Sequence, residues 1–248
     1  MTRARFVPTL ILLALAAPLQ AAEQAAALDW SGRVSLTLSV SGVLDQVPAR
    51  AGQVVKKGEL LASLEPTLFK AAVAENRADL DRLTEEHTDA KRDLERVQEL
   101  YNRTVSATTE LDAAKLRFAR AQAGLAATQA RLERARRLLA ESELRAPFDA
   151  VVLSRHGEPG LVITSQCQPA AVFSVARADE LIARAQVEGI QAAGVKLGGD
   201  TEVLAAGKTV KGRVVGLVAQ TDGRYAIEVA VPRVEGLMAG QPATIRLP

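Results

Sequence analysis

Side chains that commonly carry chemistry are few in this sequence and far apart. The chain has two histidines, His87 and His156, and a single cysteine, Cys167. Zinc sites need several His, Cys or carboxylate ligands at short spacing, and this spacing does not occur here. The sequence also lacks a Gly-x-Ser-x-Gly motif and a phosphate-binding glycine loop. The residues therefore predict no catalytic site and no metal site, so function is expected to reside in surfaces.

The N-terminus has the three parts of a secretory signal peptide. Arg3 and Arg5 precede an apolar run over residues 6–19, and the small residues Ala21 and Ala22 follow. The run is shorter than the about 20 apolar residues that a membrane-crossing helix needs. We expect residues 1–22 to be removed on export, with residues 23–31 as a linker.

The charge balance argues against a nucleic-acid partner. The chain has 31 basic and 29 acidic residues, and two of the arginines lie in the expected leader. Proteins that bind nucleic acids usually show a basic excess, and the exported chain would have none. Aromatic residues make up only 3% of the chain, which favours thin or extended units over one thick core.

The central segment, residues 67–143, predicts two helices folded back on each other. Strong helix formers dominate this segment, and Gly124 is its one glycine. Seam residues recur in alternating steps of four and three, which is typical of a coiled coil. The first series is Phe69, Val73, Asn76, Leu80, Leu83, His87, Ala90, Leu94, Val97 and Tyr101, and the second is Leu111, Ala114, Phe118, Ala121, Leu125, Thr128, Leu132, Ala135, Leu139 and Ser142.

The register breaks over residues 102–110, so this segment is expected at the tip of an antiparallel hairpin. Ser106, Thr108 or Thr109 could cap the second helix. Asn76 and His87 occupy seam positions, where a polar residue can fix the register. A structural role is therefore favoured for His87.

The segments on either side of the helices predict two halves of one β-sandwich, residues 32–66 and 144–174. Each half has short apolar stretches, and Gly42, Gly52 and Gly58 punctuate the first half as turn residues. Each half is too small to bury a core alone. An antiparallel hairpin returns the chain to its start, so the halves can pair. Residues 175–248 alternate apolar and polar residues between glycine turns, which favours a small antiparallel β-barrel.

Two motifs around the helices resemble those of the membrane fusion protein family, also called the HlyD or periplasmic adaptor family. The first is Gly52-x-x-Val55-x-x-Gly58-x-x-Leu61-x-x-Leu64, and the second is Arg145-Ala146-Pro147-Phe148-Asp149. Ala150 stands where the family usually has glycine. The signal, both half-motifs and the helices occur in the family's order.

The resemblance implies an elongated α+β fold. In it, a long antiparallel α-helical coiled-coil hairpin is inserted in a lipoyl-like β-sandwich, and a small antiparallel β-barrel follows. Many members continue into a membrane-proximal domain, so a chain ending at Pro248 is expected to be a short form. The lipoyl-like sandwich can carry biotin or lipoate on lysine, but the nearest lysine, Lys70, lacks the usual neighbours. No cofactor is expected.

The resemblance also implies a function in transport. It predicts a periplasmic adaptor, not an enzyme, that links an inner-membrane transporter to a TolC-type outer-membrane channel and self-associates into a ring, with six copies expected. A resistance-nodulation-division (RND) transporter is the expected partner, and an ABC-type exporter is the alternative. A freestanding periplasmic scaffold that dimerises through the helices stays open as a different class, and an enzyme with a swinging cofactor is a third reading.

In the family, the hairpin tip docks on the channel. The matching residues here are Arg96, Leu100, Ser106 and Asp112, although Ser106 comes one residue earlier than usual after Leu100. Leu116 should lie near Leu100 across the tip. Leu100, Leu116 and Leu138 are large apolar residues outside the seam, and exposed leucines at a tip are typical of a docking patch.

Overall fold

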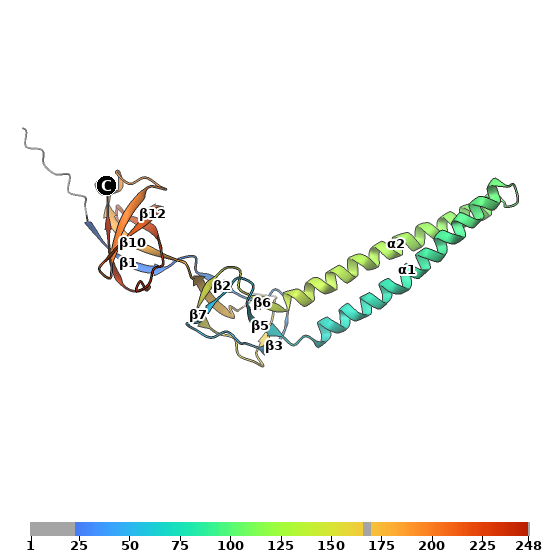
Figure 1. The fold of residues 1–248 in the computed structure, drawn as a ribbon, viewed down its shortest axis with the longest axis horizontal. Coiled ribbons are helices and arrows are strands. Elements are labelled where there is room, and N and C mark those ends of the chain that lie inside the picture. Colours follow the sequence, from blue (N-terminus) through green and yellow to red (C-terminus); the bar gives the residue numbers. More distant parts are fainter. Residues whose placement is uncertain (1–22, 166–169, 248) are drawn as a thin grey trace, which may run out of the picture. The chain divides into compact units, whose positions relative to one another are not determined.

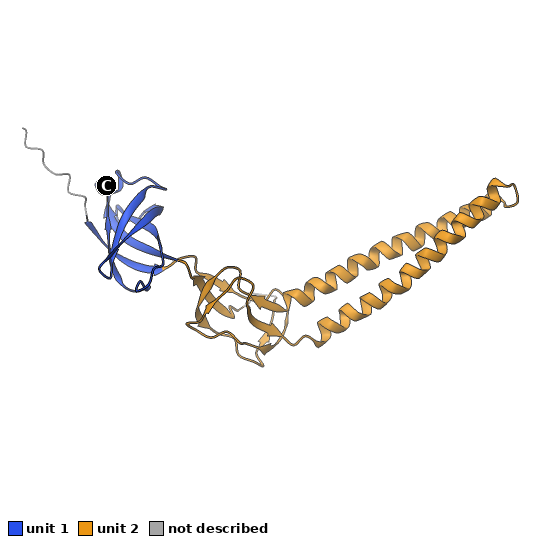
Figure 2. Cartoon of the chain, viewed as in Figure 1, with its two compact units in different colours: residues 1–29, 180–248 blue, residues 30–179 orange. Residues whose placement is uncertain are grey.

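The computed structural model describes residues 23–165 and 170–247, in two compact units (Figure 2). One unit comprises residues 30–179, and the other comprises residues 180–247 together with the N-terminal strand. The predicted signal peptide and Cys167 lie outside the described residues. None of the described helices combines the length and the apolar character needed to span a membrane.

Two long helices, α1 (Thr67–Asn102) and α2 (Thr108–Glu141), run side by side in opposite directions (Figure 1). Their register follows from contacts across the interface. The Asp93 carboxylate lies 3.0 Å from the Arg117 guanidinium, and the ring centroids of His87 and Phe118 are 5.1 Å apart. The contact nearer the start of α1 therefore involves the residue of α2 that lies nearer its end, as two antiparallel helices require.

The buried residues of both helices lie on the predicted seams. They are Val97 in α1 and Leu111, Ala114, Ala121, Thr128, Leu132 and Ala135 in α2. Asn76 donates its side-chain amide to the Ala72 carbonyl of its own helix at 2.8 Å. The Thr128 hydroxyl is fully buried and lacks a hydrogen-bond partner in the described structure.

The predicted cap of the second helix is wrong. Ala107 is the N-cap of α2, its backbone is extended, and no side chain caps the helix. The helix begins at Thr108, so Ser106 lies too early to reach the first amides. The Ser106 hydroxyl instead donates to the Glu110 carboxylate at 2.5 Å.

The sandwich consists of two four-stranded sheets that both combine strands from before and after the helices. The first sheet has the order β2 (Val34–Leu36), β9 (Phe173–Arg177), β7 (Ala150–Arg155), β4 (Val54–Val55). The second has the order β6 (Glu143–Arg145), β5 (Leu60–Leu64), β3 (Gly42–Gln46), β8 (Val162–Ile163). Their shared core includes Leu61, Leu64, Val152 and Phe173, all fully buried.

A polar clamp joins the two halves beside this core. The Asp149 carboxylate accepts from the Lys56 ammonium at 2.8 Å and from the Lys57 amide at 2.9 Å. The Gly58 amide donates to the Ala146 carbonyl at 2.8 Å. Hydrogen bonds from Lys56, and then Lys57, lower the pKa of Asp149. The two half-motifs therefore meet in space.

The three glycines singled out in the first half have two different roles. Gly52 and Gly58 have φ of +84° and +83°, which a side chain would strain, so they are turn glycines as predicted. Gly42 was also predicted in a turn, and this is wrong because it begins β3. A Cβ on Gly42 would lie 3.0 Å from the Leu64 side chain, so close packing explains this glycine.

The second unit is a closed antiparallel barrel, which confirms the predicted β-barrel. Its strand order is β1 (Glu23–Trp30), β10 (Glu180–Glu188), β13 (Arg224–Pro232), β12 (Lys208–Ala219), β11 (Asp200–Ala205), β14 (Pro242–Arg246). A short helix, α3 (Gly189–Ala192), follows β10.

Two predicted boundaries change in this unit. Residues 23–31 were expected to be a linker, but β1 closes the barrel by pairing with β14. β9, at residues 173–177, belongs to the sandwich, so the barrel resumes at residue 180 and not at 175. Arg246 reinforces the closure, because its guanidinium lies 3.1 Å from the Glu23 carboxylate and 2.9 Å from that of Glu202.

We predict that Asp149→Asn lowers the melting temperature at pH 7 and that this deficit is smaller at pH 2.5, which lies below the ordinary aspartate pKa of about 3.9. The folded-state pKa of Asp149 is lowered, so its contribution exists above the unfolded pKa and is lost as the pH falls through the folded value. Calorimetry of both proteins across this range measures the difference. An equal deficit at both pH values would contradict the role of the charge.

We predict that Thr128→Val raises the free energy of unfolding by about 1 kcal/mol, because it removes a buried hydroxyl without a partner. Thr84→Val is the control, since the Thr84 hydroxyl is exposed and donates to the Leu80 carbonyl. Urea unfolding followed by helical circular dichroism measures both. A loss of stability in Thr128→Val would mean that the hydroxyl has a partner in solution.

Candidate docking surface at the tip of the helices

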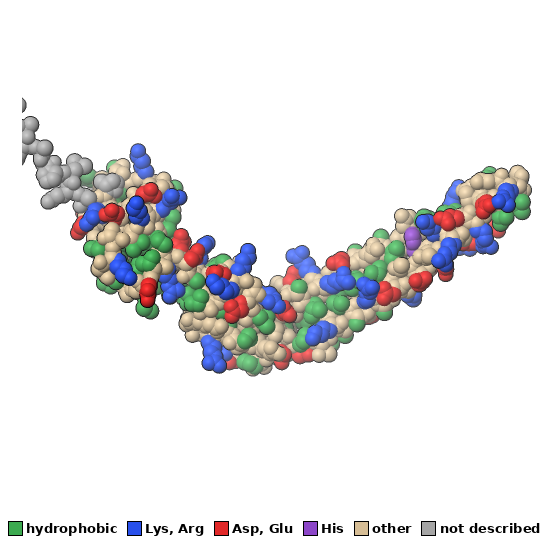
Figure 3. All heavy atoms as spheres, viewed as in Figure 1, with side chains coloured by type: hydrophobic (Ala, Val, Ile, Leu, Met, Phe, Trp, Pro, Cys, Tyr) green, Lys and Arg blue, Asp and Glu red, His purple; other side chains and the backbone are tan. Residues whose placement is uncertain are grey.

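The segment 103–107 joins the two helices, and apolar side chains are exposed around it. They are Leu100, Tyr101, Val105 and Leu116, with exposed fractions of 37%, 37%, 73% and 51%. We call these four residues the tip patch. Figure 3 shows charged side chains interspersed along the helices and apolar side chains at this end. Soluble surfaces rarely gather large apolar side chains without a binding role.

Sequence reasoning found Leu100 and Leu116 but missed Tyr101 and Val105. Tyr101 was assigned to the seam because it continues the regular series. The helical pair ends at that level, however, so the ring is partly exposed. Val105 lies in the loop, where periodicity gives no information. Its β-branched side chain among polar residues was the available signal.

Arg96 lies two helical turns before the loop and is held by its own helix. Its guanidinium binds the Asp93 carboxylate, which also binds Arg117 of α2. The hydrogen bond from Arg96, and then the charge of Arg117, lowers the pKa of Asp93. This cluster ties the helices together below the tip patch, and Arg96 stays largely exposed to solvent.

Ser106 and Asp112 have local partners within α2. Ser106 binds Glu110, and the Asp112 carboxylate lies 3.8 Å from the Lys115 ammonium. These contacts and those of Arg96 never join two of the five predicted docking residues. The structure places all five around the tip, but each polar one is already engaged locally. Gly42, Gly52 and Gly58 lie in the sandwich and take no part in this surface.

The base of the helical pair has a hollow of about 320 Å³. Apolar side chains, including Phe69 and Leu138, form much of its lining, and Arg131 and Arg134 lie on its α2 side. Since Leu68 and Leu138 are exposed there by 78% and 37%, the apolar character extends to the surface.

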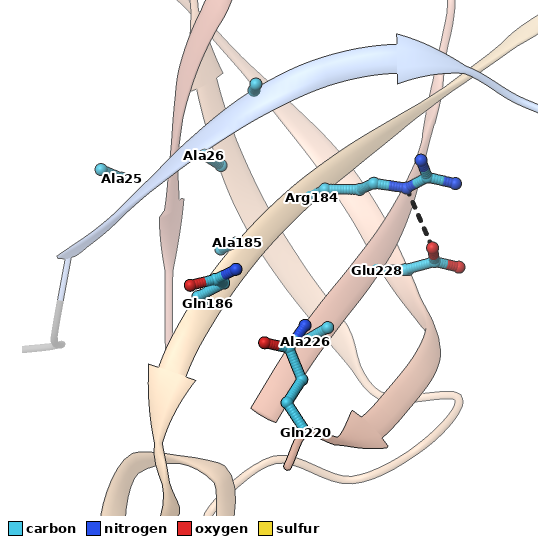
Figure 4. A pocket seen from close by; sticks show the side chains of 9 residues that line it. Ala25, Ala26, Arg184, Ala185, Gln186, Gln220, Ala226 and Glu228 are labelled. Carbon is cyan, nitrogen blue, oxygen red and sulfur yellow. Dashed lines mark hydrogen bonds and ion pairs between the residues drawn. The ribbon is translucent and has the colours of Figure 1, made fainter. Parts of the chain in front are cut away.

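A second hollow, of about 480 Å³, lies on the barrel between β1, β10 and β13 (Figure 4). Alanine side chains such as Ala25 and Ala226 line much of it. Arg184 bridges its rim, because its guanidinium lies 2.9 Å from the Glu228 carboxylate and 3.0 Å from that of Asp29. The rim charges are therefore paired, which leaves a small-residue surface between them.

Residues 23–165 and 170–247 contain no group of three or more His, Cys, Asp or Glu side chains that could hold a metal ion. His87 packs on Phe118 within the helical pair, and the His156 ring lies 2.9 Å from the Ser154 hydroxyl. Neither histidine is part of a described titratable cluster.

The sandwich of residues 30–179, divided by two long helices, defines a class of domain, the barrel-sandwich hybrid with a helical insertion. The family description "CzcB-like, barrel-sandwich hybrid domain" matches residues 33–177, which is more than half of the chain. The chain belongs to this family of membrane fusion proteins, the periplasmic adaptors.

Curated relatives agree with this assignment. The chain is 29% identical over 219 residues to nodulation protein NolF of Rhizobium meliloti, covering 86% of this chain and 59% of NolF. It is 30% identical over 157 residues to multidrug resistance protein MdtA of Cronobacter turicensis, covering 59% of this chain and 38% of MdtA. The chain therefore spans between about two fifths and three fifths of the length of these relatives.

Solved structures show the same fold. The membrane fusion protein Spr0693 of Streptococcus pneumoniae R6 superposes with a TM-score of 0.72 at 11% identity, covering 92% of this chain and 98% of that one. A MacA–MexA chimeric protein containing the Pseudomonas aeruginosa MexA α-hairpin domain superposes with a TM-score of 0.69 at 20% identity, covering 92% and 81%. At these identities the likeness concerns the fold alone.

We predict different effects for two leucines near the tip. Leu111 is buried against Val97 and Ala114, so Leu111→Ala should destabilise the helical pair by about 2–3 kcal/mol. Leu116 is half exposed, so Leu116→Ala should change stability by less than about 0.5 kcal/mol. Urea unfolding followed at 222 nm measures both, and equal losses would place Leu116 in the core rather than in the tip patch.

Proposed function

We propose that this protein is a periplasmic adaptor that links an inner-membrane transporter to a TolC-type outer-membrane channel. The exposed tip patch carries this proposal, because it lies at the free end of two long helices in a membrane fusion protein. At about 1.5 Å per residue, the 36 residues of α1 would hold the patch about 50 Å from the sandwich.

The proposed mechanism is mechanical. The helices bridge the gap between the transporter and the channel, and the tip patch binds the helical end of the channel. The sandwich and the barrel contact the transporter. Apolar burial supplies the affinity at the tip, and charged groups such as Arg96 and Asp112 set orientation. Several copies form a ring, six in our proposal, so that cargo passes through a sealed conduit. Residues 1–22 direct export to the periplasm.

The proposed transporter partner is of the RND type, with an ABC-type exporter as the alternative. The relative MdtA is named for multidrug resistance, and a similar structure is titled a putative efflux transporter. These names support efflux as the process. The proposed adaptor role is the same with either type of transporter.

The test is crosslinking in living cells from a photoreactive amino acid at position 100. We expect it to capture an outer-membrane channel protein, identified by mass spectrometry. Capture of only other copies of this chain would contradict channel docking and favour the freestanding scaffold.

We further predict that Leu100→Asp reduces copurification of the channel by more than about tenfold, because it places a charge in an apolar contact. Leu138→Asp is a matched control, since Leu138 is equally exposed but lies at the base. It should leave copurification unchanged. Helical circular dichroism of both variants checks the fold. An equal loss of channel copurification in the two variants would contradict a special role of the tip.

A further inference from the structure

Two arginines without an acidic partner lie together at the base of the helical pair. Arg131 and Arg134 of α2 line the hollow of about 320 Å³ at this end of the helices. Within the part of the chain that the structure describes, neither guanidinium makes an ion pair or a side-chain hydrogen bond. Arg137 of the same helix differs, because it lies 2.9 Å from the Glu141 carboxylate. The described chain therefore leaves the positive charge at the hollow without a counter-charge.

The spacing of the two arginines keeps their charges close to each other. Residues three apart on a helix lie on one face, with about 5–6 Å between their Cβ atoms. No acidic residue stands three or four positions away from Arg131 or Arg134. Like charges one turn apart destabilise a helix. An anion bound by both guanidinium groups would remove this repulsion, and guanidinium groups bind carboxylates through paired, charge-assisted hydrogen bonds.

The rest of the lining is mostly apolar. α1 contributes Leu68, Phe69, Ala72 and Asn76, and α2 adds an alanine and a leucine. The one uncharged polar side chain, Asn76, already donates its amide to the Ala72 carbonyl at 2.8 Å. No carboxylate belongs to the described lining of the hollow. A ligand in the hollow would therefore meet apolar side chains and the two positive charges.

The volume of the hollow fits one short hydrocarbon chain. About 320 Å³ is at the lower end of the range of small-molecule sites. A methylene group is similar in size to a water molecule, whose share of the liquid volume is about 30 Å³. The hollow therefore has room for about ten such groups, which suits a single chain and is too small for the two chains of a phospholipid.

A neighbouring hollow indicates which way such a chain would lie. It measures about 550 Å³, and Leu68 and Phe69 line it as well as the first hollow. Its lining also includes Asp45 and Glu65, and hydrogen bonds from Thr67 lower the pKa of Glu65. These carboxylates would repel an anionic group. The apolar tail would therefore extend toward Phe69, and the anionic head would stay at the arginines.

We propose that the hollow at the base of the helices binds a free single-chain amphiphile with an anionic head group, such as a fatty acid. Arg131 and Arg134 bind the head group, and Phe69 and Ala72 contact the chain. The bound molecule bridges α1 and α2 where the two helices meet the sandwich. This site is independent of the proposed docking of the tip patch on a channel, because it uses other residues at the opposite end of the helices.

The first test compares three ligands that share a ten-carbon chain. Isothermal titration calorimetry of the purified full chain measures the binding of decanoate, decanol and decyltrimethylammonium below their micelle concentrations. We expect decanoate to bind at one site per chain, at least about tenfold more tightly than decanol, because only the carboxylate can bind the guanidinium groups. The cation should show no saturable binding. Equal affinities for decanoate and decanol, or no saturable binding of decanoate, would overturn the proposal.

The second test changes the arginines and the apolar lining separately. Arg131→Gln/Arg134→Gln should lower the affinity for decanoate more than about tenfold and leave that for decanol unchanged. Ala72→Phe should weaken the binding of both ligands, because the larger side chain fills the hollow. Helical circular dichroism of each variant checks the fold.

Arg136→Gln/Arg137→Gln is the matched control, since it removes two positive charges from the same part of α2. Both arginines bind acidic neighbours and lie outside the lining of the hollow. At about 0.15 M salt, charges beyond about 8 Å are largely screened, so this variant should bind decanoate like the wild type. Unchanged binding in Arg131→Gln/Arg134→Gln, or an equal loss in the control, would overturn the assigned role of the two arginines.

The third test locates the ligand. A decanoate analogue with a photoreactive diazirine at its chain end should label residues 68–76 and 131–138, as mapped by mass spectrometry. Labelling confined to residues 100–116 would mean that the tip patch binds the chain, and the proposed site would be wrong.

A flotation assay with phosphatidylglycerol vesicles separates a free amphiphile from a membrane surface. We expect no flotation that depends on Arg131 and Arg134. Flotation that these arginines cause, together with no binding of free decanoate, would assign them to a membrane surface and overturn the proposal.

Discussion

The core of the sandwich depends on two chain segments that the helices separate in sequence. β5 pairs with β6, and β4 pairs with β7, so both sheets need strands from either side of the helical insertion. The Leu64 amide donates to the Ser142 carbonyl at 2.9 Å where the chain leaves and returns. Because neither half can bury its apolar residues alone, the antiparallel pairing of α1 and α2 is a condition for the core.

The barrel obeys a similar constraint at a different place. Its first strand lies at residues 23–30 and its others after residue 180, so the whole sandwich with its helices is inserted between adjacent strands. Backbone pairing of β1 with β14 closes the edge that would otherwise stay open, and the ion pairs of Arg246 lie along the same closure. Each unit is thus completed by segments distant in sequence.

This architecture places the available binding chemistry on surfaces. The helices expose apolar side chains at their tip, while the paired charges below the tip stabilise the helices themselves. An apolar end suits a partner that covers it.

The amino-acid sequence alone determined the positions of the helices, their seams and the division of the sandwich into halves. Periodicity and turn glycines such as Gly52 and Gly58 depend on local geometry, which sequence reports directly. Tertiary structure decided what local patterns cannot contain. In β1, Leu28 is the one buried side chain, so the alternation of buried and exposed residues along this strand is weak. The strand is recognised from its pairing with β14. Gly42 is explained by the approach of Leu64, and Tyr101 is exposed because the helical pair ends there.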